Sequence, residues 1–345
     1  MRHRVRAVVA VAFAGLLVAT SCSSDGDSAD ASGGDTKSET INLVGFAVPE
    51  AANKAIAEQW AKTPDGENVE FVTSYGASGD QSRAVVDVLA ADYVHFSVSS
   101  DVTRLVDEGL VAEDWNAGDN KGVVSTSIVV FGVPKGNPDN IEDWDDLIEP
   151  GVEIVTPNPA SSGAARWNAL AAYGQVIENG GTEEEAAAYL DQFFANVVAL
   201  PGSGRDATTA FLNGTGDVLM AYENEAIIAH QNGEEFDYII PETTMLIENP
   251  GAVLIDAHPK AQEWLDFVLS ADGQRQFAKL GFRPIIDGVD HGEVEGANDP
   301  ANPFPPVTNL LTVEPGQSMF WDDAVLPEDA AAMIGRIGPV EEVAK

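Results

Sequence analysis

Three short loops rich in glycine, serine and proline have the composition of an anion-binding site. They read SYGASG, PNPASSG and PGSGR, at residues 74–79, 157–163 and 201–205. Each loop joins a predicted strand to a predicted helix, so it offers free backbone N–H groups and a hydroxyl at a helix N-terminus. Because that end of a helix carries a partial positive charge, such loops can bind an oxyanion without a cation.

The elements that must position these loops alternate between strand and helix. Strands are predicted at residues 41–46, 69–73, 94–98, 128–133, 152–156, 197–200, 217–221 and 237–240, with an extended stretch at 245–255. Helices are predicted at residues 49–62, 81–90, 102–108, 164–177, 182–196, 207–212, 259–269 and 271–280. A capping box of Thr182 and Glu185 marks the start of one helix. This alternation is typical of doubly wound sheets, which gather ligands at the carboxyl ends of their strands.

Glycine, serine and proline are also the ordinary residues of any strand-to-helix turn. One such loop would therefore indicate nothing beyond a turn. Three loops of one design, spread over both halves of the chain, favour a binding role.

Charged residues follow each loop and need a role of their own. The cations are Arg83, Arg166 and Arg205, and the nearby acids are Asp80, Asp206 and Glu223. The arginines could contact an anion directly, or pair with carboxylates and brace the loops. We expect the acids to point away from the site as surface or cap residues, because an unpaired carboxylate beside a fully ionised anion is costly.

The first 22 residues have the pattern of an export signal. Arg2, Arg4 and Arg6 precede an apolar run at residues 8–18, which is too short to span a bilayer comfortably. Small residues then lead to Cys22, the only cysteine of the chain. We predict a signal peptide over residues 1–21, lipidation of Cys22 and a flexible tether over residues 22–40. The alternative is ordinary cleavage that leaves a secreted protein without an anchor.

The charge of the chain limits the classes of partner that it can bind. The chain has 345 residues and a net charge of −38, from 56 acidic against 18 basic side chains. This charge excludes nucleic acid as a partner, because phosphate binding needs the opposite sign. It also means that an anion site here must work through short-range geometry.

An enzyme is the alternative from a different class. The histidines are His3, His95, His230, His258 and His291, and none has metal-ligand spacing with a cysteine or another histidine. We therefore expect neither a metal nor a cofactor. A hydrolase that uses a loop serine as nucleophile would need a histidine partner, and His95 is the candidate.

Several longer motifs resemble one family. They are SYGASGDQSR, TPNPASSGAARWN, GSGRDAT, YENEA and GFRP, which lie between residues 74 and 284. In these motifs the chain resembles the sulfate-binding proteins of prokaryotic sulfate ABC transporters, in the lipoprotein form of actinobacteria, from residue 41 to at least residue 283.

The resemblance implies an α/β type II periplasmic-binding-protein fold of two doubly wound lobes. Lobe one would comprise residues 41–125 and 245–345, with an irregular tail from residue 287 wrapped around it, and lobe two residues 126–244. It also implies a monomer that closes on sulfate outside the cytoplasm and delivers it to an ABC permease with its ATPase subunits. Thiosulfate, molybdate and phosphate remain alternative ligands.

The resemblance also implies a set of sulfate contacts. The hydroxyls of Ser78 and Ser162 would donate, as would backbone N–H groups near Gly163, Ala164 and Gly204. A further backbone donor is assigned to Glu50 or Ala51. The resemblance also favours a bracing role for Arg83, Arg166 and Arg205. Tyr222 stands where some relatives place a tryptophan indole, so a phenol would replace that donor.

Overall fold

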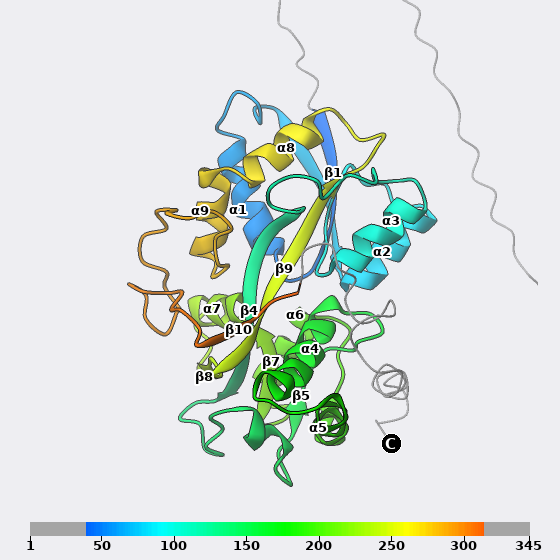
Figure 1. Cartoon of the computed structure of the whole chain (residues 1–345). Coiled ribbons are helices and arrows are strands. Elements are labelled where there is room, and N and C mark those ends of the chain that lie inside the picture. Colours follow the sequence, from blue (N-terminus) through cyan, green and yellow to red (C-terminus); the bar gives the residue numbers. More distant parts are fainter. Residues whose placement is uncertain (1–38, 314–345) are drawn as a thin grey trace, which may run out of the picture. The chain divides into compact units, whose positions relative to one another are not determined.

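The computed structural model describes residues 39–313 (Figure 1). The predicted signal peptide, Cys22, most of the predicted tether and residues 314–345 lie outside the described residues. The first strand already begins at Glu39, so the predicted tether is two residues too long.

The first group of elements builds a parallel three-stranded segment covered by helices. Its strands are β1 (Glu39–Phe46), β2 (Val69–Gly76) and β3 (Tyr93–His95), in the order β2-β1-β3. Its helices are α1 (Glu50–Trp60), α2 (Ser78–Asp87), α3 (Ser99–Asp107), α8 (Lys260–Val268) and α9 (Ala271–Lys279). Trp60, Phe71 and Trp264 pack together in its core, with the rings of Phe71 and Trp264 4.7 Å apart between centroids.

The second group follows the same plan. Its strands are β5 (Ile154–Val155), β6 (Val197–Ala199), β7 (Val218–Tyr222) and β8 (Phe236–Ile239). Its helices are α4 (Gly163–Glu178), α5 (Glu183–Ala195), α6 (Gly204–Leu212) and α7 (Glu223–Gln231), with a 3₁₀ turn, η1, at Trp144–Ile148. The predicted capping box of Thr182 and Glu185 is confirmed at the start of α5.

Two long strands join the groups. β4 (Val123–Pro134) and β9 (Thr243–Val253) pair antiparallel and run between the two groups in Figure 1. β9 also pairs with β3, and β4 with β7 and β8, so the strand order over the described residues is β2-β1-β3-β9-β4-β7-β5-β6. The predicted lobe boundaries, after residues 125 and 244, fall in these two strands and stay predictions.

The first half of β4 escaped prediction because its residues are polar yet buried. Ser125, Thr126 and Ser127 all take part in hydrogen bonds, to His95, to the Arg283 carbonyl and with the Asn224 N–H. The sequence analysis also missed α7. Its acidic first turn is buried as fully as its apolar residues, so no amphipathic pattern marks it.

The tail was predicted to wrap the first group, but its described part also packs against the second group. Val294 and Ala297 pack in one apolar cluster with Ile227 of α7 and Tyr238 of β8. A short strand, β10 (Asn309–Leu311), pairs in parallel with β9. Arg275 of α9 donates a hydrogen bond to the Asp290 carbonyl at 2.7 Å, whereas apolar burial draws this part of the tail to the second group.

Candidate anion site

The three loops converge on one small cavity. Its walls are residues 46–48 after β1, residues 76–78 at the start of α2, Ser97 after β3, residues 162–164 at the start of α4, and residues 203–204 at the start of α6. The cavity has a volume of about 10 Å³, close to the smallest volume that holds one water-sized group. It therefore admits one small group as it stands, and a larger ligand requires the walls to move apart.

The helices around this cavity begin earlier than predicted, and this places their first N–H groups at its wall. α2 begins at Ser78, α4 at Gly163 and α6 at Gly204. The first N–H groups of a helix have no partner within it. No side chain caps α2 or α4, whereas the Ser203 hydroxyl accepts from the Asp206 N–H of α6. α2 and α4 thus leave backbone donors for a ligand.

Ser162 is a serine in a cap position that does not cap. It precedes α4, its side chain makes no cap hydrogen bond, and it is only 3% exposed. Its backbone N–H donates to the Asn158 carbonyl at 2.8 Å. The hydroxyl of this cavity residue therefore stays available to a ligand.

The hydroxyl of Ser78 is engaged elsewhere, which corrects the expectation that it donates to an anion. It donates to Asp101 Oδ2 at 2.6 Å and accepts from the Ser97 N–H at 2.9 Å. Asp101 is fully buried and also pairs with Arg104 at 2.9 Å. Ser78 can still reach a ligand through its backbone N–H, at the first position of α2.

Tyr222 lies behind the cavity wall. It is 1% exposed, and its hydroxyl oxygen is 2.7 Å from Ser97 Oγ. Burial raises the pKa of the Tyr222 phenol, so it keeps its proton. Ser97 is the wall residue here, and the sequence analysis missed it; its place at the carboxyl end of a strand was the available signal.

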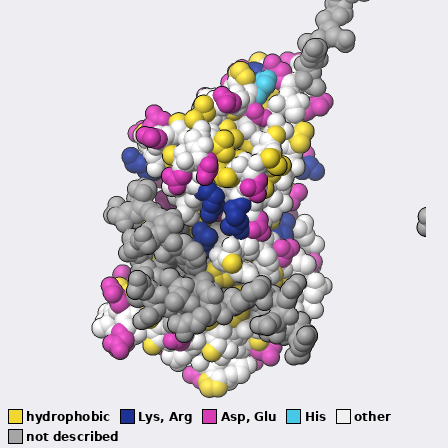
Figure 2. Space-filling model, turned by 90° about the vertical axis from the view of Figure 1, so that its right-hand side faces the viewer, with side chains coloured by type: hydrophobic (Ala, Val, Ile, Leu, Met, Phe, Trp, Pro, Cys, Tyr) yellow, Lys and Arg dark blue, Asp and Glu magenta, His cyan; other side chains and the backbone are white. Residues whose placement is uncertain are grey.

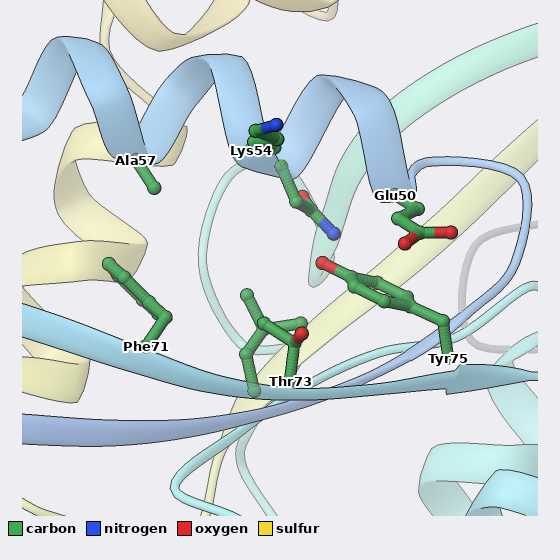
Figure 3. A pocket seen from close by; sticks show the side chains of 8 residues that line it. Glu50, Lys54, Ala57, Phe71, Thr73 and Tyr75 are labelled. Atoms are coloured by element: carbon green, nitrogen blue, oxygen red, sulfur yellow. The ribbon is translucent and has the colours of Figure 1, made fainter.

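Glu50 does not line this cavity, although residues 46–48, which precede it in the same turn, do. Its backbone N–H donates to the Ala47 carbonyl at 3.4 Å. The Glu50 side chain lines a second cavity, of about 230 Å³, with Lys54 and Tyr75, between α1 and β2 (Figure 3). Glu50 is therefore not a wall residue of this cavity, and its turn reaches the cavity through residues 46–48 instead.

The three arginines do not line the cavity. Arg83 pairs with Asp80, and Arg166 donates to Ser100 Oγ at 3.2 Å. Arg205 binds Glu225 through two hydrogen bonds, of 2.8 and 2.9 Å, and donates to the Val48 carbonyl at 3.2 Å. Figure 2 shows basic side chains gathered at mid-height on one face, among scattered acidic ones.

The acids near the loops also face away from the cavity, although one expectation about them is wrong. Asp80 pairs with Arg83, and Asp206 accepts from the Ser203 hydroxyl at 2.8 Å. Glu223, expected at the surface or in a cap, is fully buried and forms two hydrogen bonds with Arg283, of 2.7 and 3.0 Å. Within residues 39–313, no acidic side chain lines the cavity.

None of the described histidines lines this cavity. His95 is fully buried, with its ring nitrogens 3.3 Å from Asn53 Oδ1 and 3.1 Å from Ser125 Oγ, away from the loop serines. Burial lowers the pKa of His95 to about 3. Among the described residues, no group of three or more His, Cys, Asp and Glu side chains could hold a metal ion.

Hydrogen bonds join the two groups of elements around the cavity. The Gly79 N–H donates to the Ser161 carbonyl at 3.0 Å, and Trp167 Nε1 donates to the Ser97 carbonyl at 2.8 Å. With the Arg205 contact to Val48, these bonds hold the loops against one another.

This fold, with a small donor-lined cavity between two strand-and-helix lobes, defines the class of two-lobed solute-binding proteins. The model of the family described as bacterial extracellular solute-binding protein matches residues 41–283, and the chain belongs to that family. No described helix is long and apolar enough to cross a membrane.

Comparisons with individual proteins agree with this family. The chain is 39% identical over 314 residues to a sulfate-binding protein of Synechococcus elongatus, covering 88% of this chain and 87% of that one. It is 38% identical over 243 residues to a thiosulfate-binding protein of Pseudomonas aeruginosa, covering 67% of this chain and 73% of that one. The structure of the sulfate-binding protein SubI of Mycobacterium tuberculosis matches with a TM-score of 0.74 and 41% identity, over 79% of this chain and 94% of that one.

Proposed function

We propose that this chain is the extracytoplasmic sulfate-binding component of an ABC importer. The observation that carries the proposal is the cavity at the starts of α2, α4 and α6, which has backbone and hydroxyl donors and, among the described residues, no acidic side chain in its wall. Donors alone suit a fully ionised oxyanion, because every oxygen of such a ligand accepts. Hydrogen phosphate keeps a proton and needs an acceptor, which this wall does not supply through a carboxylate.

The relatives favour sulfate over other oxyanions. The Synechococcus elongatus and Mycobacterium tuberculosis relatives are sulfate-binding proteins by name. Thiosulfate is the second candidate, supported by the Pseudomonas aeruginosa relative. Both ligands present the same kind of acceptor oxygens to the helix N-termini.

The proposed mechanism is capture and delivery. The ligand contacts Ser162, Gly163, Ala164, Gly204 and the Ser78 backbone when the lobes close around it. Closure excludes water, so each dipole acts on the anion in a medium of lower dielectric constant. The closed protein then docks on a membrane permease, and ATP is hydrolysed by other subunits. No covalent step is involved, and the protein is not an enzyme.

The N-terminal features fit the same role. We expect Cys22 to carry a lipid anchor and the acidic segment after it to tether a monomeric binding protein outside the membrane. The expected result of labelling cells with a radioactive fatty acid is incorporation into this chain, and its loss in Cys22→Ser.

Isothermal titration with sulfate, thiosulfate, phosphate and molybdate tests the proposal. Sulfate should bind most tightly, and Ser162→Ala should weaken it by about 1–3 kcal/mol, the cost of a lost donor to a charged group. Ser161→Ala is the matched control, because the neighbouring Ser161 hydroxyl donates to the Gly202 carbonyl at 2.8 Å and lies outside the cavity wall. Tight phosphate binding with no sulfate binding would overturn the assignment.

A further inference from the structure

Ser97 is a buried serine whose hydroxyl lies at the cavity. It follows β3, is 0% exposed and forms part of the cavity wall. A Cβ atom added to Gly163 would lie 2.5 Å from Ser97 Oγ. This hydroxyl therefore lies directly against the first residue of α4, where a bound anion would meet the helix N-terminus.

The backbone of Ser97 is fixed on both sides. Its N–H donates to Ser78 Oγ at 2.9 Å, and its carbonyl accepts from Trp167 Nε1 at 2.8 Å and from Asn249 Nδ2 at 3.0 Å. The side chain has one hydrogen-bond neighbour among the described residues, the Tyr222 hydroxyl at 2.7 Å. What remains to be assigned is which of these two hydroxyls donates to the other.

Either of these two hydroxyls can donate to the other, because the proton of each rotates about its C–O bond. A bound anion decides between the two arrangements. A hydroxyl proton that faces an anion is stabilised by it, whereas an oxygen lone pair that faces it is repelled. An anion at the cavity wall therefore favours the arrangement in which Ser97 Oγ accepts from Tyr222 and the Ser97 proton faces the ligand.

With its oxygen accepting from Tyr222, Ser97 has a hydroxyl proton left to donate. We propose that the Ser97 hydroxyl donates directly to the bound oxyanion, and that Tyr222 is a positioning residue that orients it. This inference rests on the proposed function. It accounts for a tyrosine that is buried behind the wall and is itself no part of it.

The pair also links donor orientation to closure. Ser97 follows β3 of the first group and Tyr222 ends β7 of the second, 125 residues away in the chain. If the lobes separate at the cavity, the bond between them breaks and the Ser97 hydroxyl loses its orientation. The donor is thus complete only when both lobes surround the ligand.

A double-mutant cycle on the full chain, with sulfate affinity and thermal unfolding as readouts, tests the inference. Ser97→Ala should raise the sulfate Kd about 10- to 150-fold, the range for a hydrogen bond to a charged group. Tyr222→Phe should raise it about 2- to 10-fold in the wild-type background and leave it unchanged in the Ser97→Ala background. A residue that only supported packing would show no such dependence.

Tyr93→Phe is the control for removing a buried phenol hydroxyl. Tyr93 is also fully buried, its hydroxyl has no hydrogen-bond partner among the described residues, and it lies outside the cavity wall. This variant should bind sulfate like the wild type. If Ser97→Ala fails to fold, Ser97→Ala with Tyr222→Phe removes both partners, and its sulfate affinity decides the matter.

Two results would overturn the inference while the proposed function stands. One is wild-type affinity in Ser97→Ala, or in the double variant. The other is an equal loss from Tyr222→Phe in both backgrounds, which would mean that Tyr222 acts independently of Ser97. A wild-type chain that does not bind sulfate would overturn the proposed function, and this inference with it.

Discussion

Gly163 begins α4 where its backbone approaches Ser97 from the other group of elements. An alanine Cβ at this position would lie 2.5 Å from Ser97 Oγ, 2.6 Å from Ser97 Cβ and 3.2 Å from Val98 Cγ1. The first two separations are below 3.0 Å, which real Cβ atoms essentially never show. The Ser97 backbone cannot yield easily, because its N–H and its carbonyl are both hydrogen-bonded. Gly163→Ala should therefore obstruct closure of the cavity.

The magnitude follows from the cost of overpacking. An extra methyl group in a well-packed site costs roughly 1–3 kcal/mol, which corresponds to a sulfate Kd raised about 5- to 150-fold. In the proposed mechanism the lobes separate when no ligand is bound, so the same change should not destabilise the unliganded protein. Gly163 does not have a positive φ, and alanine is the better helix residue by roughly 0.5–1 kcal/mol in a helix interior.

Isothermal titration and thermal unfolding of the unliganded protein separate these two effects. Gly202→Ala is the matched control, because Gly202 is also a loop glycine without a positive φ and an added Cβ would meet only Asp206 Oδ2, at 3.7 Å. We expect weaker sulfate binding and an unchanged or raised Tm in Gly163→Ala alone. Wild-type affinity in Gly163→Ala would refute the reasoning, because the contact with Ser97 would then not belong to the sulfate-bound form.

Two further predictions concern stability. The pKa of His95 is lowered from 6.5 to about 3 by burial. The contribution of the neutral histidine to stability is therefore complete above pH 6.5 and falls by about 1.4 kcal/mol per pH unit as the pH drops toward 3. In urea unfolding from pH 7 to 5, the free energy of unfolding should change less steeply with pH in His95→Gln than in the wild type, and equal slopes would contradict the prediction. Arg283→Met should cost about 3–5 kcal/mol because it leaves the buried Glu223 carboxylate unpaired. Arg283→Met combined with Glu223→Gln should recover most of that loss in denaturant melts, and no recovery would show that the ion pair is not its source.

The charge of the chain explains why the site is built from dipoles. At a net charge of −38, the protein repels an anion over the range of the Debye length. Helix N-termini and hydroxyls act at hydrogen-bond distance and need no surplus of cations. The arginines nearest the loops are engaged with Asp80, Glu225 and Ser100, which leaves ligand contact to the uncharged donors.

The local sequence was enough to predict the strand-and-helix alternation, the capping box at Thr182 and the three loops that meet at the cavity. These features depend on hydrophobic periodicity and on the turn chemistry of glycine, serine and proline, which act between residues close in the chain. The same loops put Ser162, Gly163 and Gly204 at the cavity wall.

Only the tertiary structure decided which polar atoms are left for the ligand. The hydroxyl of Ser78 is taken by Asp101, 23 residues away, and Ser97 enters the wall with Tyr222 behind it, 125 residues away. The tertiary structure also buried the first turn of α7 and paired Glu223 with Arg283. A hydrogen bond has one donor proton and a narrow range of distances, so the partner that a hydroxyl finds depends on segments that the fold brings together, and no local pattern encodes it.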